Sequence, residues 1–377
     1  MKETRLDQLT SLRFFAALMI VLYHDFGVLG IGPAPVNLSQ AVSFFFVLSG
    51  FILAHVYPKL ETSQDVHRFW LARLARIWPA YLVTLLIAFA ANKFAWVPAT
   101  GIAHLLMVQA WVPLSAFYFS YNAVAWSIST EAFFYLAFPA LIRNWKHTWR
   151  AKLTAAAIVL LVLIAAAAWP HLPKYGDALN PQDSLKLSVH GLIYISPLAR
   201  LLEFMAGMAL ANFWRGPRAA SSRGTWIEVG VIALCAAAMY ITPRFAEQLR
   251  SALGAGAVMW MIRSGSFFAF AALVHVMAQG GGAISRCLRW PPFVVLGEIS
   301  FAMYLLHQSL FRVWAEHKAE LAILPQPVAI ALFFCILLGA SWLLWRLIEI
   351  PARRAILNIG RPAQPAMVLS SQSPSSA

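Results

Sequence analysis

The sequence predicts an all-α polytopic membrane protein, built as a bundle of about ten transmembrane helices. Of its 377 residues, 60% are hydrophobic and only 12% are charged, whereas a soluble domain carries about 25% charged residues. Apolar runs long enough to cross about 30 Å of hydrocarbon recur along the chain. We expect spans at 12–29, 41–56, 78–95, 124–142, 153–169, 192–213, 226–242, 252–277, 294–314 and 326–348.

The count of spans has one alternative. The segment 101–125 is also apolar and could be a further span, or a re-entrant or interfacial segment packed against protein. An odd number of spans would then result. The distribution of basic residues favours ten.

Lys and Arg are retained in the cytoplasmic loops of membrane proteins. With the N-terminus inside, the inner segments of a ten-span chain hold 18 basic residues and the outer loops hold 5. We therefore expect a multi-pass membrane protein with both termini cytoplasmic. The net charge of +14 then reflects topology and contact with anionic membrane lipid, and nucleic acid binding is not needed to explain it.

The ends and the cysteines are less informative. Two basic residues precede the first apolar run, as in a secretory signal, but no convincing cleavage site follows, so we expect a retained anchor. Three scattered cysteines indicate neither a disulfide framework nor a metal site. We assign 1–355 to one transmembrane domain and 356–377, rich in Ser and Pro, to a disordered cytoplasmic tail.

The first span carries two residues that membrane helices usually avoid, Arg13 and His24. Eleven positions separate them, which returns an α-helix to within about 20° of the same face after a rise of roughly 16 Å. Charged residues inside a span cost about 2.5–3.5 kcal/mol on insertion scales and mark function by default. We predict a polar stripe on this helix that takes part in chemistry.

Arg73 and Arg76 are spaced i, i+3, just before Pro79, at the expected cytoplasmic mouth of the third span. Two guanidinium groups on one face suit a phosphate-bearing ligand. The alternative is that they are positive-inside anchors that touch lipid phosphate. Spacing alone slightly favours the anchors.

Glu131 lies four residues after Ser127, close to Trp126 and Tyr135, where we expect an outer loop to enter the fourth span. A carboxylate there must be paired, hydrogen-bonded or in contact with water. It could orient a catalytic group or bind sugar hydroxyls. The alternative is an ion pair with Arg200 or Arg312, and we favour the functional interpretation.

Ser300, Tyr304 and His307 share one face of the ninth span, at i, i+4 and i+7. A single buried His or Tyr more often makes an ordinary interhelical hydrogen bond, but three on one face favour a polar lining. In the second span Ser43, Ser49 and Gly50 are small residues, which we assign to helix packing.

Glu349 and Pro351 close the last predicted span, and two arginines follow. The plain interpretation is a helix stop with charged anchors.

Together these motifs resemble acyltransferase family 3, the ten-span bacterial membrane O-acyltransferases. The resemblance implies a multi-pass protein of the bacterial inner (plasma) membrane. The resemblance covers about 8–354 and rests on Arg13 with His24, FFVLSGF (45–51), RLARIWPAY (73–81), WSISTEAFFY (126–135), ISFAMYLLH (299–307) and EIP (349–351). Two departures are small: Phe301 stands where Tyr is usual, and Ser309 where Pro is frequent. Neither touches the residues that the resemblance makes catalytic.

The resemblance implies transfer of an acyl group, usually acetyl, from cytoplasmic acyl-CoA, a co-substrate rather than a bound cofactor, to a hydroxyl of an envelope or exported carbohydrate or glycolipid, such as O-antigen, exopolysaccharide or lipopolysaccharide. Larger relatives carry a fused SGNH-type domain. We expect none here, so the chain would act alone or pass its acyl group to a separate extracytoplasmic transferase.

Site roles follow with unequal support. We assign His24, Arg13 and Glu131 to catalysis, with His24 as general base or as the group that carries the acyl, and Glu131 orienting His24 or the acceptor. Arg73 and Arg76 would bind acyl-CoA. Tyr304 and His307 would line the pore or the acceptor side, whereas Ser49 and Tyr135 match family positions and are structural first.

Two other classes of function remain open. Intramembrane charges also mark transporters and flippases, here of a glycan precursor. Transporter folds usually contain an internal repeat. Comparison of 1–190 with 191–377 finds no corresponding pair of broken helices, which counts against a transporter. An acyltransferase-like protein that only recruits partners would be expected to lack Arg13 or His24, and both are present.

Overall fold

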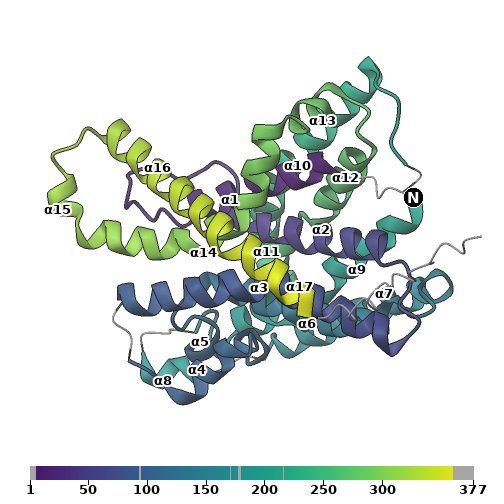
Figure 1. Cartoon of the computed structure of the whole chain (residues 1–377). Coiled ribbons are helices and arrows are strands. Elements are labelled where there is room, and N and C mark those ends of the chain that lie inside the picture. The colour runs from purple at the N-terminus through teal and green to yellow at the C-terminus, as the bar shows by residue number, and fades with distance from the viewer. Residues whose placement is uncertain (1–5, 93–94, 170, 177–179, 215, 360–377) are drawn as a thin grey trace, which may run out of the picture.

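The computed structural model describes residues 6–92, 95–169, 171–176, 180–214 and 216–359, which form a bundle of helices (Figure 1). No strand occurs in these ranges, apart from an isolated antiparallel bridge between Leu114 and Leu187. The all-α membrane architecture predicted from composition is confirmed.

The longer helices are α1 (Asp7–Tyr23), α2 (Ala41–Val56), α3 (Ser63–Asn92), α6 (Trp126–Ile142), α7 (Trp145–Ala166), α9 (Pro197–Phe213), α10 (Ser222–Gln248), α11 (Arg250–Ser264), α12 (Phe267–Gln279), α14 (Pro291–Glu316), α16 (Gln326–Leu344) and α17 (Ile350–Ile359). Short helices are α4 (Pro98–Leu105), α5 (Ser115–Tyr118), α8 (Pro181–Ser184), α13 (Ala283–Leu288) and α15 (Lys318–Leu321). Single turns are η1 (Leu38–Gln40), η2 (Gln109–Trp111) and η3 (Ala123–Ala125), with π-helical turns at η4 (Gly191–Ile195) and η5 (Trp345–Glu349).

Within the described ranges, nine helical segments are long and apolar enough to cross a membrane. They match the second to tenth predicted spans. The segment that covers the first, α1, has 17 residues, which is the lower end of the length a spanning helix needs. With α1, the count agrees with the ten predicted spans.

Several predicted boundaries are wrong, including the start of α7 at Trp145 instead of 153 and the end of α10 at Gln248 instead of 242. The first span is Asp7–Tyr23 instead of 12–29. The third begins at Ser63, well before 78, and runs through Pro79 without a break, since proline is tolerated within transmembrane helices. The helix stop expected at Pro351 does not occur, because the chain continues from η5 into α17 and ends that helix at Ile359. The remainder of the predicted tail, 360–377, lies outside the described residues.

The apolar segment 101–125 forms a cap of short helices and turns, not a span. α4, η2, α5 and η3 follow one another beneath α3 in Figure 1. His104, fully buried in this cap, contacts the Tyr81 hydroxyl through Nδ1 (3.2 Å) and the Ser120 hydroxyl through Nε2 (2.9 Å). The Tyr81 hydroxyl also donates to the His104 carbonyl oxygen (3.0 Å), so a side chain satisfies a backbone group in this irregular segment.

Two close helix pairs build the centre of the bundle. α2 packs along α9, and Gly50 permits this, because a Cβ atom there would meet the Phe204 carbonyl oxygen of α9 at 1.8 Å. α1 packs along α14, where a Cβ at Gly297 would lie 2.1 Å from the Thr10 carbonyl oxygen. The packing role predicted for Gly50 is confirmed, and Gly297 sets the polar stripe of α1 directly against α14.

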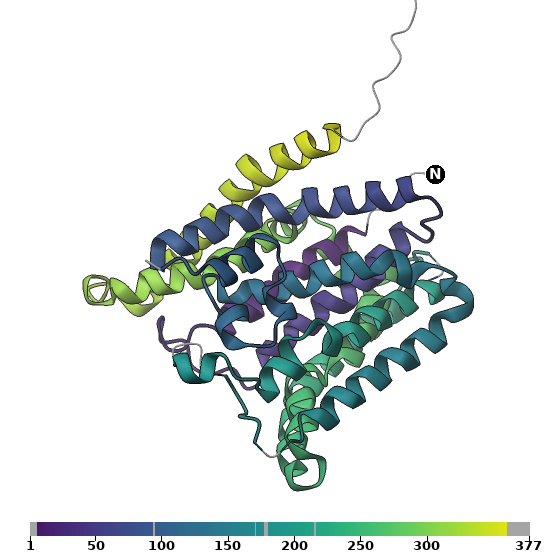
Figure 2. The same cartoon turned by 90° about the horizontal axis from the view of Figure 1, so that it is seen from below.

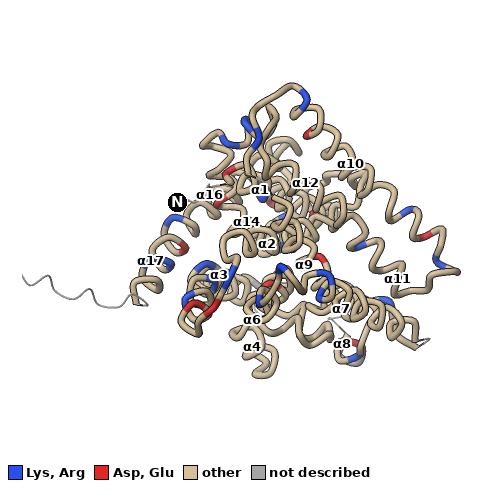
Figure 3. The backbone as a smooth tube through the Cα atoms, turned by 90° about the vertical axis from the view of Figure 1, so that its right-hand side faces the viewer, with Lys and Arg blue, Asp and Glu red and all other residues tan. Residues whose placement is uncertain are grey.

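The periphery is apolar and exposed. Leu161 of α7, Leu234 of α10 and Leu343 of α16 each expose half or more of their surface, as suits helices that face hydrocarbon. α17 lies against α3 at one margin of the bundle, as the view from below shows (Figure 2). Figure 3 looks along the bundle from the end at which α1 begins, with Lys and Arg of α3 and α17 at that end. We call it the basic end.

Candidate active site

A cavity of about 110 Å³ lies between α1, α2, α3, α6 and α14. We call it the arginine cavity. Its polar lining consists of Arg13, Ser49, Arg73, Arg76, Ser127, Glu131, Tyr135, Ser300 and Tyr304. Five of the motifs singled out in the sequence therefore converge on one small space, although they come from five helices.

Arg73 and Arg76 reach this cavity because they share one face of α3, three residues apart. They lie within α3, ten residues or more past its start, because this helix begins earlier than the predicted third span. The Arg73 guanidinium donates to the Tyr57 hydroxyl (3.2 Å) and lies 5.9 Å from the centre of the Tyr135 ring. These arginines thus line an internal cavity, which lipid anchors would not do.

Glu131 belongs to the arginine cavity as well. Its Oε1 accepts hydrogen bonds from the Ser49 hydroxyl (3.0 Å) and the Tyr135 hydroxyl (2.5 Å). The structure therefore places Glu131 among the arginines, and not in the cavity that His24 lines. Ser49 and Tyr135, assigned to structure first, hold this carboxylate.

The ion pair considered for Glu131 is made by another residue. Arg200, wholly buried on α9, pairs with Glu203 one turn further on (3.0 Å) and also bonds to Ser264 and Ser43. This arrangement ties α9 to α11 and α2 and pairs the buried arginine with a carboxylate.

A smaller cleft of about 50 Å³ adjoins the arginine cavity, and Arg13 and Arg76 line both. Its other charged residues are Glu298, Glu349 and Arg353. Glu349 and Arg353 were interpreted from sequence as a helix stop and an anchor. Because α17 follows η5 and packs on α3, both residues instead face the arginines.

A larger cavity, about 690 Å³, lies on the other side of Tyr304, and we call it the histidine cavity. Its polar and aromatic lining comprises Tyr23, His24, Phe26, Ser39, Thr100, Ser115, Phe119, Ser120, Tyr121, Trp126, Tyr175, His190, Tyr194, Arg263, Tyr304, Gln308 and Arg312. The cap of short helices supplies one of its walls. It is the larger of the two spaces by several fold.

His24 follows the last residue of α1, and its Nδ1 lies 3.0 Å from the Ile20 carbonyl oxygen and 3.1 Å from Nε2 of His307. Nδ1 of His307 lies 2.6 Å from the Tyr304 carbonyl oxygen. A carbonyl only accepts, so each Nδ1 carries a proton, and the bare Nε2 of His307 accepts from His24. These contacts leave Nε2 of His24 unprotonated in the neutral ring.

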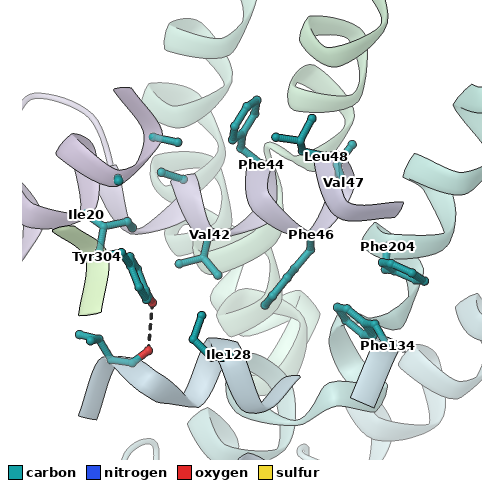
Figure 4. Close-up of a cluster of buried hydrophobic side chains, with 14 of the residues drawn as sticks. Ile20, Val42, Phe44, Phe46, Val47, Leu48, Ile128, Phe134, Phe204 and Tyr304 are labelled. Atoms are coloured by element: carbon teal, nitrogen blue, oxygen red, sulfur yellow. Dashed lines mark hydrogen bonds between the residues drawn. The ribbon is translucent and has the colours of Figure 1, made fainter. Parts of the chain in front are cut away.

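Tyr304 and Val42 line both cavities and therefore form the partition between them. The Tyr304 hydroxyl bonds to the Ser127 hydroxyl (2.7 Å) and donates to the Val124 carbonyl (3.0 Å). Figure 4 shows the Tyr304 ring beside Val42 and Ile20, with its oxygen directed at the neighbouring segment of the chain. Of the polar face predicted on α14, Ser300 lines the arginine cavity and Tyr304 lines both cavities. His307, predicted to line the pore or the acceptor side, is instead buried behind the wall of the histidine cavity and contacts His24.

Sequence reasoning missed several lining residues, notably Arg263, Tyr23 and His190. Arg263 could have been noticed, because it is a cation within an apolar span. Tyr23 precedes His24 and looked like an ordinary aromatic. His190 stands alone in a loop, without a spacing pattern that would mark it.

The residues of both cavities lie within a segment that matches a known protein family. A family model described as an acyltransferase domain matches residues 6–346. The chain belongs to this acyltransferase family. Membership confirms the resemblance drawn from the motifs, and it makes the chain an enzyme that transfers acyl groups.

Three relatives of the acyltransferase are informative. The acyltransferase MdmB of Streptomyces mycarofaciens is 31% identical over 343 residues, which cover 82% of this chain and 80% of MdmB. The O-acetyltransferase OatA of Staphylococcus aureus is 23% identical over 81% of this chain and 50% of its own length. YrhL of Bacillus subtilis, a candidate peptidoglycan O-acetyltransferase, is 23% identical over 79% of the chain and 47% of its own length. The chain therefore matches about half of the latter two relatives, and no solved structure matches it.

Proposed function

We propose that this O-acyltransferase takes an acyl group, usually acetyl, from cytoplasmic acyl-CoA and transfers it across the membrane to a carbohydrate hydroxyl. The observation that carries the proposal is the partition: the arginine cavity and the histidine cavity meet at Tyr304 and Val42. A donor bound by arginines at one end of the bundle thus needs to pass only one layer of side chains to approach His24.

The donor side is assigned by charge. Arg13, Arg73 and Arg76 line connected spaces near the basic end, and Arg353 of α17 lines the smaller of them. Guanidinium groups bind phosphate oxygens by charge-assisted hydrogen bonds. With the basic end cytoplasmic, as the positive-inside rule favours, CoA phosphates would lie near these arginines and the thin pantetheine arm would enter the arginine cavity.

Glu131 supports this assignment without requiring a catalytic role near His24. Its carboxylate lies in the same cavity as Arg13, Arg73 and Arg76, so it partly offsets three cations in a low-dielectric site. We propose that Glu131 orients the arginines and the arm of the donor.

His24 is the proposed general base. As the acceptor oxygen attacks the thioester carbonyl carbon, a C–O bond forms and the C–S bond breaks. The hydroxyl proton moves to Nε2 of His24, which then returns it to the departing CoA thiolate. His307 holds the proton on Nδ1 and so keeps Nε2 available for this transfer.

The acceptor assignment rests on the histidine cavity and on the relatives. Its volume and aromatic lining suit a sugar ring. OatA and YrhL are O-acetyltransferases by name, and the name of YrhL specifies peptidoglycan. We therefore propose a carbohydrate acceptor.

The test uses sealed membrane vesicles that contain the whole protein in known orientation, supplied with acetyl-CoA labelled in the acetyl group. Label should enter extractable carbohydrate in vesicles whose outer face carries the basic end of the protein, where added acetyl-CoA can reach it. No label should enter in vesicles of the opposite orientation. His24→Ala should abolish transfer, because no base remains. Arg68→Gln, an exposed arginine on α3, is the matched control and should transfer at the normal rate.

Two results would contradict the proposal. One is transfer at the normal rate by His24→Ala. The other is no incorporation from acetyl-CoA or longer acyl-CoAs, while a glycan precursor still crosses the vesicle membrane in a protein-dependent manner. The second result would favour the transporter.

A further inference from the structure

The histidine cavity is cationic. Arg263 of α11 and Arg312 of α14 both line it, and none of the described residues around it is Asp or Glu. The arginine cavity differs, because Glu131 accompanies its cations. Arg263 makes no ion pair with a carboxylate among the described residues, and it gives the cavity an electrostatic preference for a negatively charged occupant.

Arg263 is held in place but is not neutralised. Its Nη1 donates to the Tyr23 hydroxyl (2.7 Å) and the Ser39 hydroxyl (3.1 Å), and the guanidinium lies 5.2 Å from the centre of the Tyr194 ring. Nε is buried without a partner. In the described part of the chain, Arg263 makes no ion pair with a carboxylate.

Arg200 shows how this fold treats an arginine that is purely structural. It contacts the same Tyr194 ring at 5.1 Å, yet it pairs with Glu203 at 3.0 Å and is wholly buried. Arg263 lines a cavity of about 690 Å³, and its side-chain hydrogen bonds go to hydroxyl groups only. A half-buried guanidinium left with neutral partners is suited to take its anion from a ligand.

The position of Arg263 connects this anion site to the chemistry. Tyr23, which accepts from Arg263, immediately precedes His24, and the two rings are 5.0 Å apart. An anionic group bound by Arg263 therefore lies next to His24, in the same cavity. The rings of Tyr23, His190 and Tyr194 provide flat surfaces beside it.

We propose that Arg263 binds an acidic group of the acceptor, so that the acceptor is an acidic carbohydrate bearing a carboxylate or a phosphate near the hydroxyl that is acylated. The inference deepens the proposed function and rests on it. Arg312 is the second cation of the site. Arg263 positions the acceptor and takes no part in proton transfer.

Binding is tested first, with the purified whole protein and saturating CoA, which blocks anion binding at the donor site. Titration calorimetry compares methyl glucuronide, glucose 1-phosphate and the neutral methyl glucoside at constant ionic strength. One or both acidic sugars should bind, the neutral sugar at least about tenfold more weakly. Arg263→Gln should remove this difference and Arg263→Lys should retain part of it. Arg250→Gln, an exposed arginine of the same helix paired with Glu247, is the matched control.

Transfer is tested second, with labelled acetyl-CoA and the same sugars as acceptors. Arg263→Gln should raise KM for the acidic acceptor by about tenfold or more with little change in kcat. His24→Ala should abolish transfer and leave acidic-sugar binding intact. Preference of the carboxylate over the phosphate, or the reverse, identifies the acidic group.

The two proposals fail differently. Equal binding of acidic and neutral sugars, or an acidic preference that survives Arg263→Gln, would overturn the anion site even if transfer occurs. Acidic-sugar binding that depends on Arg263, without transfer that depends on His24, would keep the anion site and overturn the acyltransfer step assigned to His24.

Discussion

The two cavities differ in size and in the treatment of charge. The arginine cavity is about 110 Å³ and surrounds its cations with Glu131, Tyr135 and Ser49. The histidine cavity is about 690 Å³ and offers hydroxyls, aromatic rings and two arginines. A narrow space in which Glu131 accompanies the cations suits a thin donor arm. A wide space in which Arg263 has no carboxylate partner among the described residues suits a bulky acceptor.

Tyr304 connects this comparison to the reaction. It belongs to both linings, and His307, three residues later on α14, contacts His24. One helix therefore carries both the partition and the residue that sets the proton of the base. Substitutions in the two cavities should consequently affect different kinetic constants.

The largest effect is expected from the double change Arg73→Gln and Arg76→Gln. Each arginine offers a charge-assisted contact to phosphate, and two such contacts are worth about 100-fold or more in affinity. KM for acetyl-CoA should rise by that amount, while KM for the acceptor stays near its normal value. Steady-state kinetics with both substrates varied checks this, with Arg68→Gln as control. A rise in the acceptor KM alone would reverse the assignment of the two cavities.

Substitution of His307 should reduce kcat. Without an acceptor near Nδ1, the His24 ring loses one of the two contacts that fix its tautomer, so His307→Phe should lower kcat about tenfold to 100-fold. His307→Gln retains an acceptor oxygen and should recover part of the rate. Both KM values should change little, and the pH profile of kcat should shift in His307→Phe only. Equal rates in the two variants would show that His307 acts by packing alone.

The fold was largely predictable because a membrane imposes simple rules on composition and length. A helix lies at each of the ten predicted spans, and nine of the segments are long and apolar enough to cross a membrane among the described residues. The errors are at ends such as Ser63 and Ile359, where the helix continues into more polar sequence. Gly50 was assigned to packing correctly, because a small residue in an apolar helix has few other uses.

The site was predictable residue by residue but not as an arrangement. Helical spacing places Tyr304 and His307 on one face, yet it cannot show that His307 meets His24, which lies 283 residues away in the chain. Glu131 was expected to act near His24, but it lies in the arginine cavity. The sequence could not show this, because the position of Glu131 along the bundle depends on the cap of short helices that precedes α6. Arg263 had only its charge to mark it, and its lack of a carboxylate is a property of the fold.

Tyr304 itself tests the partition, with a moderate effect. Tyr304→Phe removes hydrogen bonds to Ser127 and Val124, which costs about 1 kcal/mol, and should slow transfer several-fold. Tyr304→Ala should widen the connection and raise the rate with butyryl-CoA relative to acetyl-CoA. Competition between the two labelled donors measures this ratio. A ratio unaltered in Tyr304→Ala would show that the acyl group does not pass this residue.

The smallest expected effect is a difference between the two cavities in how binding depends on pH. Burial lowers the pKa of His104, in the cap beside the histidine cavity, to about 4. The folded protein keeps this ring neutral while the unfolded chain takes up a proton near pH 6.5, so the stabilisation is complete above that pH and declines as the pH falls towards 4. The loss is at most roughly 3 kcal/mol. His104→Gln should flatten the pH dependence of the melting temperature in this window, relative to the wild type. As the pH falls, acceptor binding should weaken before CoA binding, because the cap lines only the histidine cavity. Loss of acceptor binding and CoA binding at the same pH would mean that the two cavities unfold as one unit.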